Sequence, residues 1–104
     1  MAKSLYTIQM DFKKANESAA ELEKTAKALK NLGNSEFQTE IDKIASEWKG
    51  ENSNNYIAKC NELRNKLLKT SDDIYKTADM IRSVAKNTYN AEKKAYEIAL
   101  IRKK

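Results

Sequence analysis

The sequence predicts an all-α protein folded as an antiparallel helical hairpin. Of its 104 residues none is proline and only Gly33 and Gly50 are glycine, too few for the turns that a sheet protein needs roughly every ten residues. Apolar residues recur three and four positions apart over most of the chain, which is the period of one helix face. The clearest stop in this pattern lies near mid-chain, at Gly50. A chain of this length is expected to form a single domain, residues 1–104.

The first arm is predicted over residues 4–48. Its apolar seam alternates three- and four-residue steps, as the a and d positions of a heptad do. The members of the seam before the first glycine are Leu5, Ile8, Phe12, Ala15, Ala19, Leu22, Ala26 and Leu29. The next step falls on Gly33, and the seam then resumes one residue out of phase. Its later members are Phe37, Ile41, Ile44 and Trp48.

A break or kink near residue 33 would explain this slip in phase. Gly33 suits the left-handed position after a helix end, and Ser35 to Gln38 fits a capping box for a new helix. The alternative is a continuous helix that tolerates the glycine at a cost of ~1 kcal/mol. We favour the break.

The turn is predicted at residues 48–52, with Gly50 in a positive-φ conformation. The segment Glu51–Asn55 offers several side chains suited to capping the next helix, so the second arm is expected over residues 53–100. Its seam has the same period as the first. The members are Tyr56, Cys60, Leu63, Leu67, Thr70, Ile74, Ala78, Ile81, Ala85, Thr88, Ala91, Ala95 and Ile98.

Two such arms enclose no core of their own, so the sequence predicts a dimer. A wider apolar face would stay in water, namely Tyr6, Leu68, Tyr75, Val84 and Tyr89. A second hairpin alongside would cover it and make a four-helix bundle. The partner is either an identical chain or a related helical hairpin. The expected core and dimer stripe comprises Leu22, Leu29, Ile41, Ile44, Leu63, Leu67, Ile74 and Ile81.

Enzymatic and cofactor chemistry find little support. Without histidine and with one cysteine, the chain has no imidazole base, no cysteine metal cluster and no internal disulfide. A thin helical rod also offers no deep pocket, so we expect no catalytic residues, metal, cofactor or small-molecule substrate. Cys60 is read as a small buried side chain, or as a cross-link between protomers in an oxidising medium. The longest apolar run, Ile98–Ile101, predicts a soluble protein, and no cleaved leader is expected.

The net charge of +5 lies in the second half of the chain. Residues 51–104 hold 12 basic and 7 acidic side chains. The basic residues gather at the tail, as Lys93, Lys94, Arg102, Lys103 and Lys104. This tail is either a solvated helix end that suits the macrodipole, or a contact for an acidic protein or a membrane headgroup layer. A basic nucleic-acid-binding helical protein is the alternative function, but charges of both signs alternate along the arms, which makes nucleic acid an unfavoured partner.

The residues at the turn carry a family resemblance. Trp48-Lys49-Gly50 stands at the reversal, and an aromatic follows at Tyr56. A chain of about a hundred residues with this motif between two long helices resembles the WXG superfamily, the early-secreted-antigen-like substrates of type VII (ESX) secretion, over its whole length. Physically, Trp48 can wedge against the second arm while Gly50 permits the reversal. The plainer reading is a core residue followed by a cap.

The resemblance implies a small non-enzymatic protein exported without a cleaved signal peptide from the cytoplasm of a Gram-positive bacterium. The secretion ATPase would be one partner. The protein would act in virulence as a dimeric effector or adaptor, or as the co-secreted partner of a larger toxin whose helical N-terminal domain it covers.

The family's export signal, Tyr-x-x-x-Asp/Glu, is matched by Tyr75 and Asp79, which share a helix face. The match lies earlier than the family places it, and an ordinary exposed helix pair is the alternative. A broader form of the signal fits at Glu92, although Thr88 stands where an apolar residue belongs. Familiar members are acidic or neutral, so the positive charge of this chain is a further departure.

Overall fold

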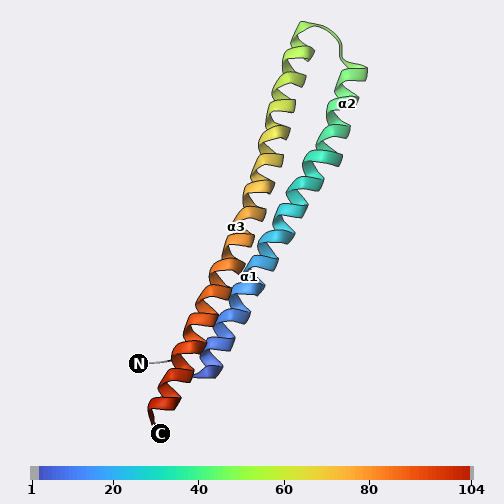
Figure 1. Cartoon of the computed structure of the whole chain (residues 1–104). Helices are drawn as coiled ribbons and strands as arrows, with labels where there is room; N and C mark the ends of the chain where they lie inside the picture. Colours follow the sequence, from blue (N-terminus) through green and yellow to red (C-terminus); the bar gives the residue numbers. More distant parts are fainter. Residues whose placement is uncertain (1–2, 104) are drawn as a thin grey trace. The chain divides into compact units, whose positions relative to one another are not determined.

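The computed structural model describes residues 3–103, and nearly all of this part of the chain is helical. In chain order the elements are α1 (Leu5–Asn31), the π-helical turn η1 (Leu32–Glu36), α2 (Phe37–Glu47) and α3 (Glu51–Lys103) (Figure 1). Residues 3, 4 and 48–50 are the described positions outside helices, and none of residues 3–103 is in a strand. The predicted all-α class is confirmed.

The predicted break near residue 33 is wrong. Gly50 is the one described residue with positive φ, so Gly33 is not a left-handed cap, and α1 continues through η1 into α2. Nor does Ser35 begin a new helix, because the residue before α2 is Glu36 in a helical conformation. A π-helical turn takes up one residue more than an α-helix, and this accounts for the one-residue slip of the apolar seam.

The chain reversal is tighter than predicted. Gly50 has φ 126°, and its carbonyl accepts a hydrogen bond from the Asn54 N–H at 3.0 Å, so α3 begins at Glu51. The side chains expected to cap the second arm therefore lie inside the first turn of α3. Ser53 is among them, and its hydroxyl donates to the Gly50 carbonyl at 2.8 Å. The link is residues 48–50 rather than 48–52.

Two compact units make up the chain. We call Glu23–Tyr75 the central unit and Met1–Leu22 with Lys76–Lys104 the terminal unit, each considered for its described residues. Both α1 and α3 contribute to each unit.

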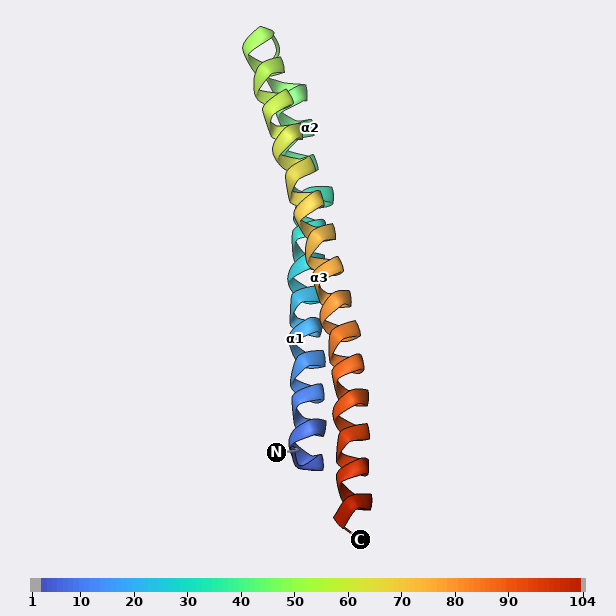
Figure 2. The same ribbon diagram turned by 60° about the vertical axis from the view of Figure 1, so that its left-hand side comes forward.

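The central unit is an antiparallel pair of helical segments joined by the link (Figures 1 and 2). Going away from the link, Trp48 meets Tyr56, the Gly33 carbonyl accepts from Arg64, and the Ala26 carbonyl accepts from Ser71. The side chains buried there are mostly small, since Ala26 and Ser53 are fully buried and Ser71 is 1% exposed. Small side chains let two helix backbones approach closely. Ile41 is the one large side chain buried among the described residues of this unit.

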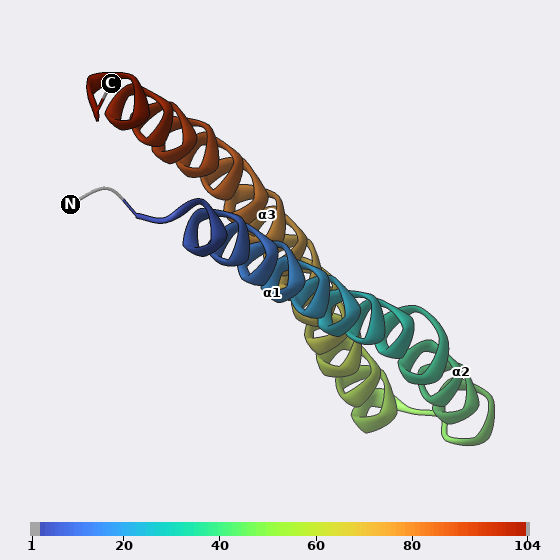
Figure 3. The same ribbon diagram turned by 90° about the horizontal axis from the view of Figure 1, so that it is seen from below.

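The terminal unit pairs the start of α1 with the end of α3, also antiparallel (Figure 3). Lys3 reaches Glu92, and the ring of Phe12 lies on that of Tyr89. Its buried residues are Ile8, Ala19 and Ala78. None of the helices within residues 3–103 is long and apolar enough to cross a membrane.

Candidate interaction surface

The terminal unit contains an apolar groove of about 390 Å³. One face of helix α1 and one face of helix α3 line the groove. The lining residues are Ile8, Asp11, Phe12 and Ala15 from α1, and Met80, Ile81, Val84, Ala85, Thr88, Tyr89 and Glu92 from α3. Both sets recur with the i, i+3, i+4, i+7 spacing of one helix face, so the amphipathic period of the sequence builds the groove directly.

The floor and walls of the groove differ in how well they are covered. Ile8 is 2% exposed at the floor. The rings of Phe12 and Tyr89 pack with centroids 4.7 Å apart and planes tilted by 35°, a geometry that aromatic pairs favour. On α3, however, Met80 is 65% and Val84 is 57% exposed. The groove therefore presents large apolar side chains to water on one wall.

An ion-pair cluster closes the end of the groove where α1 begins. The Lys3 ammonium lies 3.1 Å from an oxygen of Asp11 and 3.0 Å from one of Glu92. Hydrogen bonding to Glu92, and then to Asp11, raises the pKa of Lys3 above 10.5. The two carboxylates are thus held by one cation, which lets like charges from α1 and α3 lie at the same place.

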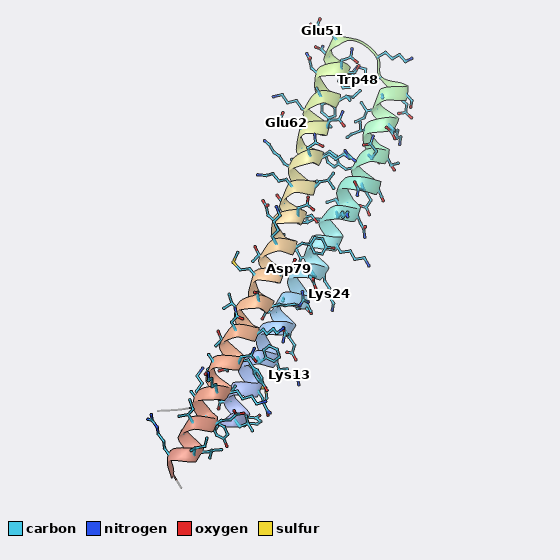
Figure 4. All side chains as sticks on the ribbon, viewed as in Figure 1. Lys13, Lys24, Trp48, Glu51, Glu62 and Asp79 are labelled. Carbon is cyan, nitrogen blue, oxygen red and sulfur yellow. The ribbon has the colours of Figure 1, made fainter. Side chains whose placement is uncertain are left out.

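The turn motif forms a second, smaller feature at the link between α2 and α3 (Figure 4). Trp48 is extended (φ −125°, ψ 119°) just past the end of α2, and its N–H donates to the Ile44 carbonyl at 2.9 Å. The indole meets the ring of Tyr56 with a centroid distance of 6.0 Å. Trp48 remains 48% and Tyr56 51% exposed, so this contact is half open to water.

The residues proposed as an export signal differ in their exposure and in their contacts. Tyr75 is half-buried in the central unit, whereas Asp79 is exposed in the terminal unit. Glu92 belongs to the Lys3 cluster and its side chain is 23% exposed.

The predicted core stripe is mostly covered within the chain. Ile41 is buried. Those half-buried are Leu22, Leu29, Ile44, Leu67, Ile74 and Ile81. Leu63 is the exception, because it is 51% exposed and so is not a core residue of this chain. The residues of the wider apolar face also differ in exposure. Tyr6 and Val84 are exposed, whereas Leu68, Tyr75 and Tyr89 are half-buried.

Sequence reasoning missed the cluster of Lys3 with Asp11 and Glu92, and the place of Met80 on the wall of the groove. Lys3 and Asp11 are far from Glu92 along the chain, and only a mirror placement of the two arms about Gly50 could have brought them together. Met80 lies off the seam that Ala78 and Ile81 carry, so the period of the seam does not predict its exposed place on the groove wall. Cys60 is half-buried with a free thiol. The described residues contain no group of three or more Cys, Asp or Glu side chains arranged to hold a metal ion.

Comparison of the chain with protein-family models, with curated proteins and with solved structures finds no match. The resemblance to the WXG superfamily stays an expectation from the sequence, which rests on Trp48, Gly50 and Tyr56.

Proposed function

We propose that this chain is a non-enzymatic interaction protein, a helical hairpin that pairs lengthwise with a second helical hairpin in a four-helix bundle. The observation that carries this proposal is the apolar groove of the terminal unit, with Met80 and Val84 exposed on its wall. A helix laid in this groove would remove both side chains from water, at about 25 cal/mol for each Å² of apolar surface covered. The second hairpin is another copy, a related chain or the N-terminal domain of a toxin.

We further propose export by type VII secretion, as effector, adaptor or co-secreted toxin partner. The support is the placement of the Trp-x-Gly motif at the reversal, with Gly50 at positive φ and Trp48 against Tyr56. Within this proposal Tyr75 and Asp79 are the better candidates for the signal. Asp79 is exposed, whereas Glu92 is held by Lys3.

Pairing is tested by light scattering on the purified chain at micromolar concentration. We expect a mass of about twice 11.9 kDa for a homodimer, or a poorly helical monomer when a different hairpin is the obligate partner. Val84→Asp should abolish the dimer because it places a charge in the apolar contact. Asn87→Asp, the same new charge at an exposed position of α3 outside the groove lining, should leave the mass unchanged. A monomer that melts cooperatively would contradict the proposal.

Export is tested by detecting the protein in culture supernatant with and without the secretion ATPase. We expect it outside the cell only when the ATPase is present. In the wild-type strain, the double variant Tyr75→Ala and Asp79→Ala should stay inside, while Asp72→Ala, an exposed carboxylate earlier on α3, should be exported. Equal extracellular amounts in both strains would contradict the proposal of export by type VII secretion, but would not affect the proposal of pairing with a second hairpin.

A further inference from the structure

The central unit contains a hydrogen bond that an α-helix would not need. In an α-helix the Phe37 N–H would donate to the carbonyl of Gly33, four residues earlier. In η1 it donates to the Leu32 carbonyl instead, five residues earlier. The Gly33 carbonyl thereby loses its α-helical donor, and Arg64 of α3 supplies a replacement through its Nε–H at 3.0 Å. The same guanidinium lies 3.4 Å from the Asn34 side-chain oxygen.

Helix α3 also comes close to the backbone at Gly33. A Cβ built on Gly33 would lie 3.1 Å from Leu68 Cδ2 and 3.4 Å from its Cγ. Gly33 is buried and takes no positive φ, so the glycine serves this close approach rather than a turn. Leu68 and Arg64 are one turn apart on α3, so both can meet the same residue.

The π-helical turn decides which face of α2 is covered. Continued from Gly33 without an extra residue, the three- and four-residue steps fall on charged side chains. These would be Glu36, Glu40, Lys43 and Glu47. One extra residue turns α2 by about 100°. The covered positions then become Phe37, Ile41 and Ile44, with Ile41 4% exposed, while the four charged residues are exposed. The burial of several charges is thereby avoided.

We propose that Arg64 and Gly33 form a register lock, which holds one surplus residue at η1 and so sets the rotational phase of α2. Any carbonyl freed by a π-helical turn needs a donor when it is buried, because an unpaired polar group there is costly. Gly33 is where a donor from α3 is available and where the missing side chain admits α3. The lock therefore fixes the surplus residue at this point of the helix. Arg64 acts as a positioning residue, independent of the pairing and export proposed above.

The test combines loss of the donor with loss of the surplus residue. Deleting Ser35, an exposed member of η1, should restore a regular α-helix in which the Gln38 N–H serves the Gly33 carbonyl. Arg64→Met keeps an apolar stem and removes the donor. In the full-length chain Arg64→Met should lower the melting temperature by roughly 5–10 °C and speed exchange of the backbone amides of residues 36–40 about tenfold or more. In the chain lacking Ser35 it should shift the melting temperature by less than about 2 °C.

Two controls keep this outcome specific. Lys69→Met, an exposed cation on α3, should be silent in both backgrounds. Deleting Ser18, an exposed residue of α1 that precedes η1 by fourteen positions in the sequence, should be strongly destabilising because it creates a phase error instead of removing one. Equal effects of Arg64→Met in both backgrounds would overturn the lock. So would unfolding of the chain that lacks Ser35, since the residue would then not be surplus.

Discussion

At the scale of single residues, the two members of the turn motif have different roles. Gly50 is required by backbone conformation, because its φ of 126° lies where residues with a side chain are strained. Trp48 is extended and half-exposed, so it stabilises the link partly through Tyr56 and still presents an apolar surface.

We expect Gly50→Val to lower the free energy of unfolding by ~1–2 kcal/mol. A Cβ at this position would meet no atom within 4 Å, so the cost is backbone strain alone. Urea denaturation measures it. Lys49→Val introduces the same side chain one residue earlier, where φ is not positive, and should cost much less. Equal losses for the two variants would show that φ is not the cause.

Trp48→Ala should cost about 1–2 kcal/mol, which is below the ~3 kcal/mol or more expected for a fully buried indole. The reason is that the ring is 48% exposed and makes its aromatic contact with Tyr56, itself 51% exposed. Denaturation of the variant at a concentration where the protein is monomeric isolates this contribution. A larger loss appearing only at dimer-forming concentrations would place Trp48 in the interface.

At the scale of the elements, the chain spaces its helices with small residues. Within the central unit, Ser71 is 1% exposed, and its hydroxyl donates to the Ala26 carbonyl at 2.6 Å across the two helices. A hydroxyl at this contact both fits the narrow gap and stays hydrogen-bonded, so α1 and α3 are held close without a large core.

Ser71→Leu should therefore be far more damaging than Ser71→Ala. The larger side chain forces the backbones apart, which costs about 1–3 kcal/mol or more. The smaller one loses a single hydrogen bond, worth ~1 kcal/mol. Thermal melting of the two variants compares these effects directly. Similar losses would mean that the hydrogen bond, not the spacing, matters at this position.

In the terminal unit, Lys3 links the segment before α1 to α3 and makes a pH-dependent contribution. Its pKa is raised in the folded protein by Glu92 and then Asp11, so its stabilising effect is present below pH 10.5 and is lost as pH rises through the raised pKa. Lys3→Met should lower the melting temperature slightly at pH 8, and the difference from the wild type should shrink as the pH rises above 10.5 and through the raised pKa of Lys3. The exposed Lys14, changed to Met, should show no such pH-dependent difference. A difference for Lys3→Met that persists at high pH would assign its effect to packing.

At the scale of the whole molecule, charge and apolar surface suggest different partners. The chain carries 20 basic and 15 acidic side chains, and the two signs alternate along the helices. Pairs such as Lys13 with Glu17 and Lys66 with Glu62 offset part of the positive charge locally. The apolar groove is the more specific feature, and it favours a helical protein as partner.

We accordingly expect duplex DNA to bind more weakly than ~1 µM at near-physiological salt. A filter-binding titration at two salt concentrations measures this. Tighter binding with a steep salt dependence would instead favour the nucleic-acid-binding alternative, because it would show that the lysines act together on phosphates.

The sequence by itself determined the helical class, the position of the reversal and most of the seam. These follow from local period and composition, namely the three- and four-residue steps, the absence of proline and Gly50. The sequence also contains the one-residue shift in the phase of the apolar seam after Gly33, but a break in the helix and a π-helical turn explain this shift equally well.

Only the tertiary structure decided between them, because the deciding groups, Arg64 and Leu68, are distant in sequence and reach Gly33 only when α3 lies alongside. The same holds for the groove. Its lining repeats a period visible in the sequence, yet Lys3, Asp11 and Glu92 form one cluster only where the start of α1 meets the end of α3. Periodicity fixes which face a residue occupies, whereas contacts between distant segments fix what that face meets.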